Sequence, residues 1–230
     1  MNAGPPADPH DGCLILRAGR TDRQAKGGLV LLHGRGGTAE DIARLAPALG
    51  AEDFAIAAPQ AADRSWWPVS FLAPMDALEP WLSSALAATG RAVAALEQRG
   101  LARRDIAIAG FSQGACLALE YAARSGGPFR AVLGLSGGLV GTSDAADRGE
   151  AAVRGHGGKD FDYGPARLDG VSVYLGCHSF DPHIPAERVK TSAAVLRRRG
   201  AEVAMRLHPG AGHGLHPADL TAARAALAAG

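Results

Sequence analysis

The sequence predicts an α/β fold in which a mainly parallel central sheet is covered by helices on both faces. Short apolar runs that stop at Gly, Pro or His alternate with longer stretches of helical periodicity, which is typical of parallel strands joined by helices. The short runs are almost continuously apolar, as expected for strands buried on both sides. A length of 230 residues suits one layered domain of this kind with a sizeable core.

Six apolar runs are predicted to be strands, namely 29–32, 54–58, 106–109, 131–135, 171–175 and 203–207. A shorter run at 14–16 is a candidate leading strand. Helical patterning occupies the segments between them, at 39–49, 76–99, 113–124, 185–199 and 217–228. Ligands of such sheets bind beyond the carboxyl ends of the strands, so the residues that follow each strand are the candidates for a functional site.

We expect a single domain over 13–230, preceded by a frayed tail at 1–12, because the first ten residues are polar and rich in Pro. One internal stretch, 141–170, holds many Gly, Asp and Arg residues and few large apolar ones. A loop of that length inside a compact domain is expected to be either a lid over the site or a plain surface excursion.

Composition excludes several classes of partner. Lys plus Arg number 24 against 23 Asp plus Glu, which disfavours binding to nucleic acid or to an anionic membrane surface. No apolar run approaches the roughly 20 residues of a membrane span, so no membrane insertion is expected. Three widely separated cysteines favour reduced thiols in a cytoplasmic protein. The sequence is compatible with a homodimer but gives no signal for one.

A G-x-S-x-G pattern, typical of a nucleophilic serine on a sharp turn between strand and helix, occurs twice. The matches are Gly110-Phe-Ser112-Gln-Gly114 and Gly134-Leu-Ser136-Gly-Gly138. Ser112 follows a predicted strand and opens a helical stretch, whereas no helical pattern follows Ser136. We therefore predict Ser112 as the nucleophile. Ser136 is expected to be a turn residue beside the site, and its substitution by alanine is expected to do little.

A serine hydroxyl needs a base, usually a histidine oriented by a carboxylate, and on this type of turn both follow the serine in the chain. His213 lies in a Gly-rich segment after the last predicted strand and is the predicted base. Asp181 follows the fifth predicted strand and is the predicted acid. The nearest rival base is His216, and the rival acids, which precede the fifth strand, are Asp160, Asp162 and Asp169.

The oxyanion that forms during attack needs two backbone N–H groups that already point at it. One is expected from Gln113, which follows the nucleophile, and the other from Arg35, in the Gly-rich turn after the first strand. His33 is interpreted as a structural strand-end residue. The Arg35 side chain is expected either to pair with a substrate carboxylate or to point to solvent.

A pocket wall is predicted from the aromatic residues Trp66, Trp67 and Phe71, which are either substrate-binding or packed beneath a long loop. The sequence also leaves open two other functions, a metal-dependent hydrolase and a non-catalytic binding protein. Cys177, His178, Asp181 and His183 are residue types that suit a catalytic zinc ion. The fold can also serve as a non-catalytic ligand-binding module.

Taken together, the segments around His33, Ser112, Asp181 and His213 resemble the phospholipase/carboxylesterase family of α/β-hydrolases, which includes the acyl-protein thioesterases. The resemblance spans about 28–217 and implies a small, cytosolic serine esterase without metal or organic cofactor. By position, the triad of the family falls on Ser112, Asp181 and His213, and its oxyanion donors fall on Arg35 and Gln113.

The chain departs from the thioesterase branch at two places: Arg35 replaces an aliphatic residue, and 65–71 replaces a proline-rich segment. Long-chain lipid and protein-deacylation activities are therefore not carried over. The predicted function is a serine carboxylesterase that hydrolyses small-molecule esters of short to medium acyl chains through an acyl-enzyme. The alternative is thioesterase or lysophospholipase activity on the same triad.

Overall fold

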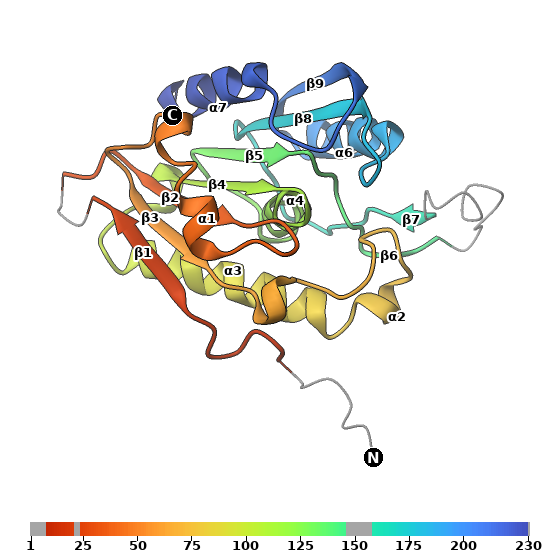
Figure 1. Ribbon diagram of the computed structural model, residues 1–230, viewed down its shortest axis with the longest axis horizontal. Coiled ribbons are helices and arrows are strands. Elements are labelled where there is room, and N and C mark those ends of the chain that lie inside the picture. The colour runs from red at the N-terminus through yellow and green to blue at the C-terminus, as the bar shows by residue number, and fades with distance from the viewer. Residues whose placement is uncertain (1–7, 21–23, 146–157, 230) are drawn as a thin grey trace.

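The computed structural model describes residues 8–20, 24–145 and 158–229 and is built on a seven-stranded sheet (Figure 1). The strands lie in the order β1-β3-β2-β4-β5-β8-β9. Their bounds are β1 Ile15–Gly19, β2 Gly28–Leu32, β3 Ala55–Pro59, β4 Ile106–Phe111, β5 Ala131–Leu135, β8 Ser172–Phe180 and β9 Glu202–Ala211. Only β1 runs antiparallel to its neighbour, and every other pair in this sheet is parallel. The predicted α/β class is confirmed.

Helices cover both faces of the sheet (Figure 1). Helices α1 (Ala39–Ala43) and α7 (Pro217–Ala229) pack on one face, and α3 (Trp81–Glu97), α4 (Gln113–Ser125) and α6 (Ala186–Arg198) pack on the other. Successive residues of β2 enter the two apolar cores alternately, Leu29 and Leu31 on the α7 side and Val30 and Leu32 on the α4 side. This double burial explains why the strands are apolar at every position.

Two predicted helices are interrupted at prolines. The stretch 39–49 divides into α1 and a 3₁₀ turn at Pro47–Leu49. The stretch 76–99 divides into α2 (Met75–Leu78) and α3, and Pro80 lies between them. Proline lacks the N–H that continues a helical ladder, so apolar periodicity alone overestimates the length of both helices.

The tail prediction is wrong for residues 8–12. His10 is fully buried, and its ring accepts a hydrogen bond from the Ala62 N–H (3.1 Å) at Nδ1 and contacts the Trp66 carbonyl oxygen (3.0 Å) through Nε2. The Arg91 guanidinium also binds the His10 carbonyl at 2.7 Å. A polar histidine that can satisfy both ring nitrogens packs as firmly as an apolar residue, which composition does not reveal. Residues 1–7 lie outside the described residues.

The stretch 141–170 is partly built into the fold. Its described parts contain a short antiparallel pair, β6 (Ser143–Asp144) and β7 (Lys159–Asp160). Tyr163 is buried and donates a hydrogen bond of 2.8 Å to the Glu120 carboxylate on α4. The rest of the expected lid or loop, 146–157, lies outside the described residues. Across the helices that the structure describes, none is long and apolar enough to cross a membrane.

Candidate active site

Ser112 sits on a sharp turn between β4 and α4, with φ of 55° and ψ of −119°. This left-handed backbone is unusual for a residue with a side chain and marks stored strain. Glycine is required on either side of Ser112 because a Cβ at these positions would collide with backbone atoms. A Cβ on Gly110 would lie 2.1 Å from the Gly114 carbonyl oxygen, and a Cβ on Gly114 would lie 2.1 Å from the Leu32 carbonyl oxygen. The G-x-S-x-G pattern therefore follows from the packing of β4, α4 and β2.

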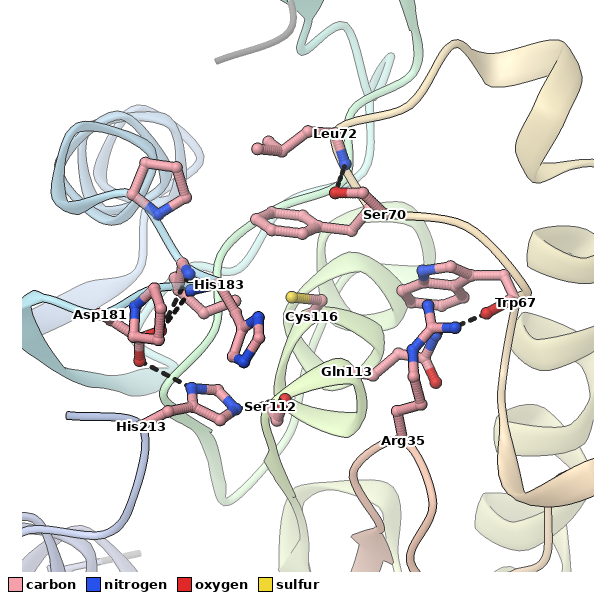
Figure 2. Close-up of a pocket in the computed structure, with 14 residues that line it drawn as sticks. Arg35, Trp67, Ser70, Leu72, Ser112, Gln113, Cys116, Asp181, His183 and His213 are labelled. Carbon is pink, nitrogen blue, oxygen red and sulfur yellow. Dashed lines mark hydrogen bonds and ion pairs between the residues drawn. The ribbon is translucent and has the colours of Figure 1, made fainter. Parts of the chain in front are cut away.

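The structure brings Ser112, His213 and Asp181 together in one chain of hydrogen bonds (Figure 2). His213 Nε2 lies 2.8 Å from Ser112 Oγ, and His213 Nδ1 lies 2.8 Å from Asp181 Oδ2. The Asp181 side chain is fully buried, whereas the His213 side chain is 20% exposed toward the cavity. A base between a hydroxyl and a buried carboxylate is the arrangement that activates a serine.

The Asp181 carboxylate is held by groups of its own loop, which follows β8. Its Oδ1 accepts hydrogen bonds from the backbone N–H of His183 (2.8 Å) and of Ile184 (3.0 Å). The Cys177 thiol lies 3.6 Å from Oδ2. These contacts leave Oδ2 directed at His213, so the carboxylate has one orientation available to it.

Ser136 also has a positive φ, of 54°, but its surroundings differ from those of Ser112. Its side chain is buried, and its Oγ donates to the Gly214 carbonyl oxygen at 3.3 Å. The rival histidine His216 accepts a hydrogen bond from the Ala218 N–H (3.2 Å) at the start of α7. The structure therefore leaves both rivals outside the Ser112–His213 pair.

The predicted oxyanion donors lie beside the nucleophile. Gln113 is the first residue of α4, where backbone N–H groups are free of helical partners. The turn that carries Arg35 packs against Ser112, since a Cβ on Gly34 would lie 3.3 Å from the Ser112 Cβ. Both residues line the cavity at Ser112. Two backbone donors at this place suit an oxyanion.

The side chains of the same two residues hold the loop that follows β3. The Gln113 amide donates to the Trp67 carbonyl (2.8 Å) and accepts from the Trp66 N–H (2.9 Å). The Arg35 guanidinium donates to the carbonyls of Pro68 (2.9 Å) and Val69. Arg35 thus has a structural partner that neither sequence interpretation of its side chain included, and partial burial lowers its pKa.

A cavity of about 680 Å³ opens over Ser112. Its lining includes apolar side chains from two loops, namely Trp67, Phe71, Leu72, Pro182, Ile184 and Pro185. Trp67 and Phe71 are thus on the wall, as a substrate-binding role requires. Trp66 is not: its indole N–H binds the His33 carbonyl at 2.8 Å, and its ring lies 5.0 Å from the His33 ring. Trp66 therefore matches the other expectation, packing beneath the loop.

Cys116 and His183 also line the cavity. Complete burial raises the pKa of the Cys116 thiol to about 12, so it stays protonated and does not compete with Ser112. The His183 ring lies 4.8 Å from the His213 ring, edge to face (Figure 2). The sequence singled out His183 only as a metal ligand, and its position two residues after Asp181 was the available signal for a place in this site.

The four candidate zinc ligands separate into two groups. Cys177, Asp181 and His183 lie near His213, whereas the His178 ring lies 5.7 Å from His208 and 6.1 Å from His216. In residues 8–20, 24–145 and 158–229, no group of three or more His, Cys, Asp or Glu side chains is arranged to hold a metal ion.

Comparison with known proteins decides the family. The family model described as Phospholipase/Carboxylesterase matches residues 17–229. This chain belongs to that family. A phospholipase/carboxylesterase of known structure from Dyadobacter fermentans is 34% identical, with a TM-score of 0.83 over 94% of this chain and 97% of that one. The resemblance inferred from the motifs, and the α/β-hydrolase fold that it implied, are confirmed.

Two further relatives are more distant. The acyl-protein thioesterase 1 of Gibberella zeae is 30% identical over 128 residues, which are 56% of this chain and 49% of that protein, so the match spans about half of the curated relative. The structure of the Bacillus cereus carboxylesterase aligns with 95% of this chain over 95% of its own, with a TM-score of 0.69. At 17% identity this match is a likeness of fold.

Proposed function

We propose that the protein is a serine carboxylesterase that hydrolyses small esters of short to medium acyl chains through an acyl-enzyme. The observation that supports this most strongly is the hydrogen-bond chain from Ser112 Oγ through His213 to the buried Asp181 carboxylate. The family is named for ester hydrolases, and the wall of the cavity at Ser112 includes the apolar side chains of Trp67, Phe71 and Leu72.

In the proposed first half-reaction, His213 Nε2 takes the Ser112 proton while Oγ forms a bond to the ester carbonyl carbon. The carbonyl oxygen becomes an oxyanion that accepts hydrogen bonds from the Gln113 and Arg35 backbone N–H groups. As the tetrahedral intermediate collapses, the bond to the alcohol oxygen breaks and His213 gives that oxygen its proton. The alcohol leaves, and the acyl group stays on Ser112.

In the second half-reaction, water replaces the alcohol. His213 takes a proton from the water, whose oxygen bonds to the acyl carbon, and then returns the proton to Ser112 Oγ as the acid departs. Asp181 stays ionised throughout, and it holds His213 in the tautomer whose Nε2 accepts a proton. The reaction consumes one ester and one water, yields one alcohol and one acid, and restores Ser112 and His213 to their starting states.

A thioester or a lysophospholipid, which is itself an oxygen ester, is the alternative substrate, because the same triad and oxyanion donors act on thioester and oxygen-ester bonds. The Gibberella zeae relative, an acyl-protein thioesterase, supports this alternative over the aligned half of its length.

The test is the initial rate of hydrolysis of p-nitrophenyl esters with two to twelve acyl carbons, run beside acyl-thioesters of the same lengths. We expect an optimum at short to medium chains, a preference for oxygen esters, and a loss of several orders of magnitude in Ser112→Ala. Activity that persists in Ser112→Ala would contradict the proposal. No turnover of any ester by the wild type would favour the non-catalytic reading.

A further inference from the structure

A buried carboxylate outside the triad, Asp219, contacts the loop that carries His213. Its side chain is 1% exposed, and it takes no part in the Ser112–His213–Asp181 chain. Oδ1 lies 2.6 Å from both the Tyr174 hydroxyl and His208 Nε2, and Oδ2 accepts the His216 backbone N–H at 3.1 Å. One carboxylate therefore connects β8, β9, the start of α7 and the end of the His213 loop.

The absence of a side chain at Gly176 leaves the space that this carboxylate occupies. A Cβ on Gly176 in β8 would lie 2.1 Å from Asp219 Oδ1. The connection is reciprocal, since the Asp219 N–H binds the His216 carbonyl at 2.8 Å while the carboxylate binds the His216 N–H. The carboxylate that accepts the N–H of the residue before α7 supplies one half of a capping box, whereas the Asp219 N–H binds the His216 backbone carbonyl and not its side chain. The rings of His208 and His216 also stack, with 3.9 Å between their centroids.

Ser136 contacts the same loop from the sheet side. Its backbone N–H binds the Gly176 carbonyl at 2.7 Å, which places it at the end of β5, and its Oγ donates to the Gly214 carbonyl. Its φ of 54° is a strained conformation for a serine, which persists where the surroundings require it. Here the twist aims the buried hydroxyl at the residue that follows His213.

The loop needs such anchors because His213 stands between Gly212 and Gly214, and glycine backbones have wide conformational freedom. We propose that Asp219 and Ser136 are positioning residues that hold segment 212–216 so that the His213 imidazole meets Ser112 Oγ. This inference rests on the proposed function for its effect on turnover. A misplacement of about 1 Å at a reacting group costs on the order of 100-fold in rate, so anchors of the base loop act on kcat.

The test compares Asp219→Asn and Ser136→Ala with matched controls. Asp169→Asn alters an exposed carboxylate that pairs with Arg167, and Ser125→Ala removes a serine that also donates to a carbonyl at 3.3 Å. We expect kcat to fall about 10- to 100-fold in Asp219→Asn, with KM within about twofold. In Ser136→Ala the contact with Gly214 replaces the small effect expected from the sequence by a fall of about 3- to 10-fold in kcat, with KM again within about twofold. Both controls should keep wild-type kcat and KM.

Hydrogen exchange of the amides in 212–216, followed by mass spectrometry below the unfolding temperature, is the second readout. We expect faster exchange there in both variants and unchanged exchange in the control proteins. If Asp219→Asn does not fold, Ser136→Ala decides by the same two measurements. Unchanged exchange in 212–216, or a rise in KM with unchanged kcat, would overturn the positioning role. If the wild type hydrolyses no ester, the proposed function fails while the exchange data still decide whether these residues hold the segment.

Discussion

At the scale of single residues, the strongest constraint on the site is the orientation of Asp181. Two backbone N–H groups donate to its Oδ1, so only an oxygen can occupy that position. The second oxygen faces His213 Nδ1, which therefore carries a proton, and Nε2 is left to accept one from Ser112. The tautomer of the base is thus set by two amides that touch neither the histidine nor the serine.

Replacing Asp181 by Asn tests that reasoning. The amide oxygen of Asn would stay with the two N–H groups, so its NH₂ would face Nδ1 and impose the other tautomer on His213. We expect kcat to fall by about 10³- to 10⁴-fold, somewhat less than in Ser112→Ala, with a folded protein. Steady-state kinetics and circular dichroism check this, with Asp76→Asn as an exposed control. A loss below tenfold would mean that Asp181 does not orient the base.

At the scale of elements, the pocket wall and the proposed oxyanion donors are connected by direct hydrogen bonds. Gln113 and Arg35, the two proposed oxyanion donors, use their side chains to hold 66–69, and Trp67 and Phe71 of the same loop line the cavity. A change in the wall therefore reaches the oxyanion donors through direct hydrogen bonds.

Gln113→Leu removes the side-chain grip and keeps the backbone N–H. The buried Trp66 N–H would lose its acceptor, at a cost of about 1–3 kcal/mol, so the loop should loosen. We expect kcat/KM to fall about tenfold and the preference among acyl chain lengths to flatten. Kinetics on four- and eight-carbon esters measure both effects, beside Gln98→Leu on the exposed end of α3. A variant that keeps the wild-type length profile would show that Gln113 does not brace the wall.

The elements also show how far sequence reasoning reaches. The strands are continuous apolar runs because both faces are buried, so they could be found from the sequence, and so could the nucleophile turn. The order of Ser112, Asp181 and His213 placed all three in loops at one edge of the sheet. Pro80 is a signal in the sequence for a helix break, but the apolar periodicity of 76–99 favoured one continuous helix. Contacts such as Asp219 with Tyr174 join residues 45 positions apart, and no local pattern signals them.

At the scale of the whole molecule, two buried histidines couple stability to pH. Burial lowers the pKa of His10 and of His33 below the ordinary value of 6.5. Below pH 6.5 these two histidines therefore bind more protons in the unfolded chain than in the folded protein. Their contribution to stability is complete above pH 6.5 and is lost as the pH falls toward their folded-state pKa values. His10 joins residues near the amino terminus to the 3₁₀ turn after β3, so this loss concerns a long-range contact.

His10→Gln tests the linkage. We expect the free energy of unfolding of the wild type to be lower at pH 5.5 than at pH 7.5, and the difference to be smaller in the variant, which has lost one of the two groups. At pH 7.5 the variant should itself be less stable by about 1–3 kcal/mol, because hydrogen bonds to the ring are lost. Urea unfolding at the two pH values provides the measurement. An equal fall in the free energy of unfolding between pH 7.5 and pH 5.5 in both proteins would show that His10 does not contribute to the pH dependence.

The most direct test of the central claim is covalent trapping of the nucleophile. The protein is incubated with a fluorophosphonate, digested, and mapped by tandem mass spectrometry, with Ser112→Ala and Ser136→Ala treated in parallel. We expect a single adduct on the peptide that contains Ser112, complete loss of labelling in Ser112→Ala, and slower labelling at the same site in Ser136→Ala. An adduct on Ser136, or equal labelling of Ser112→Ala, would contradict the account.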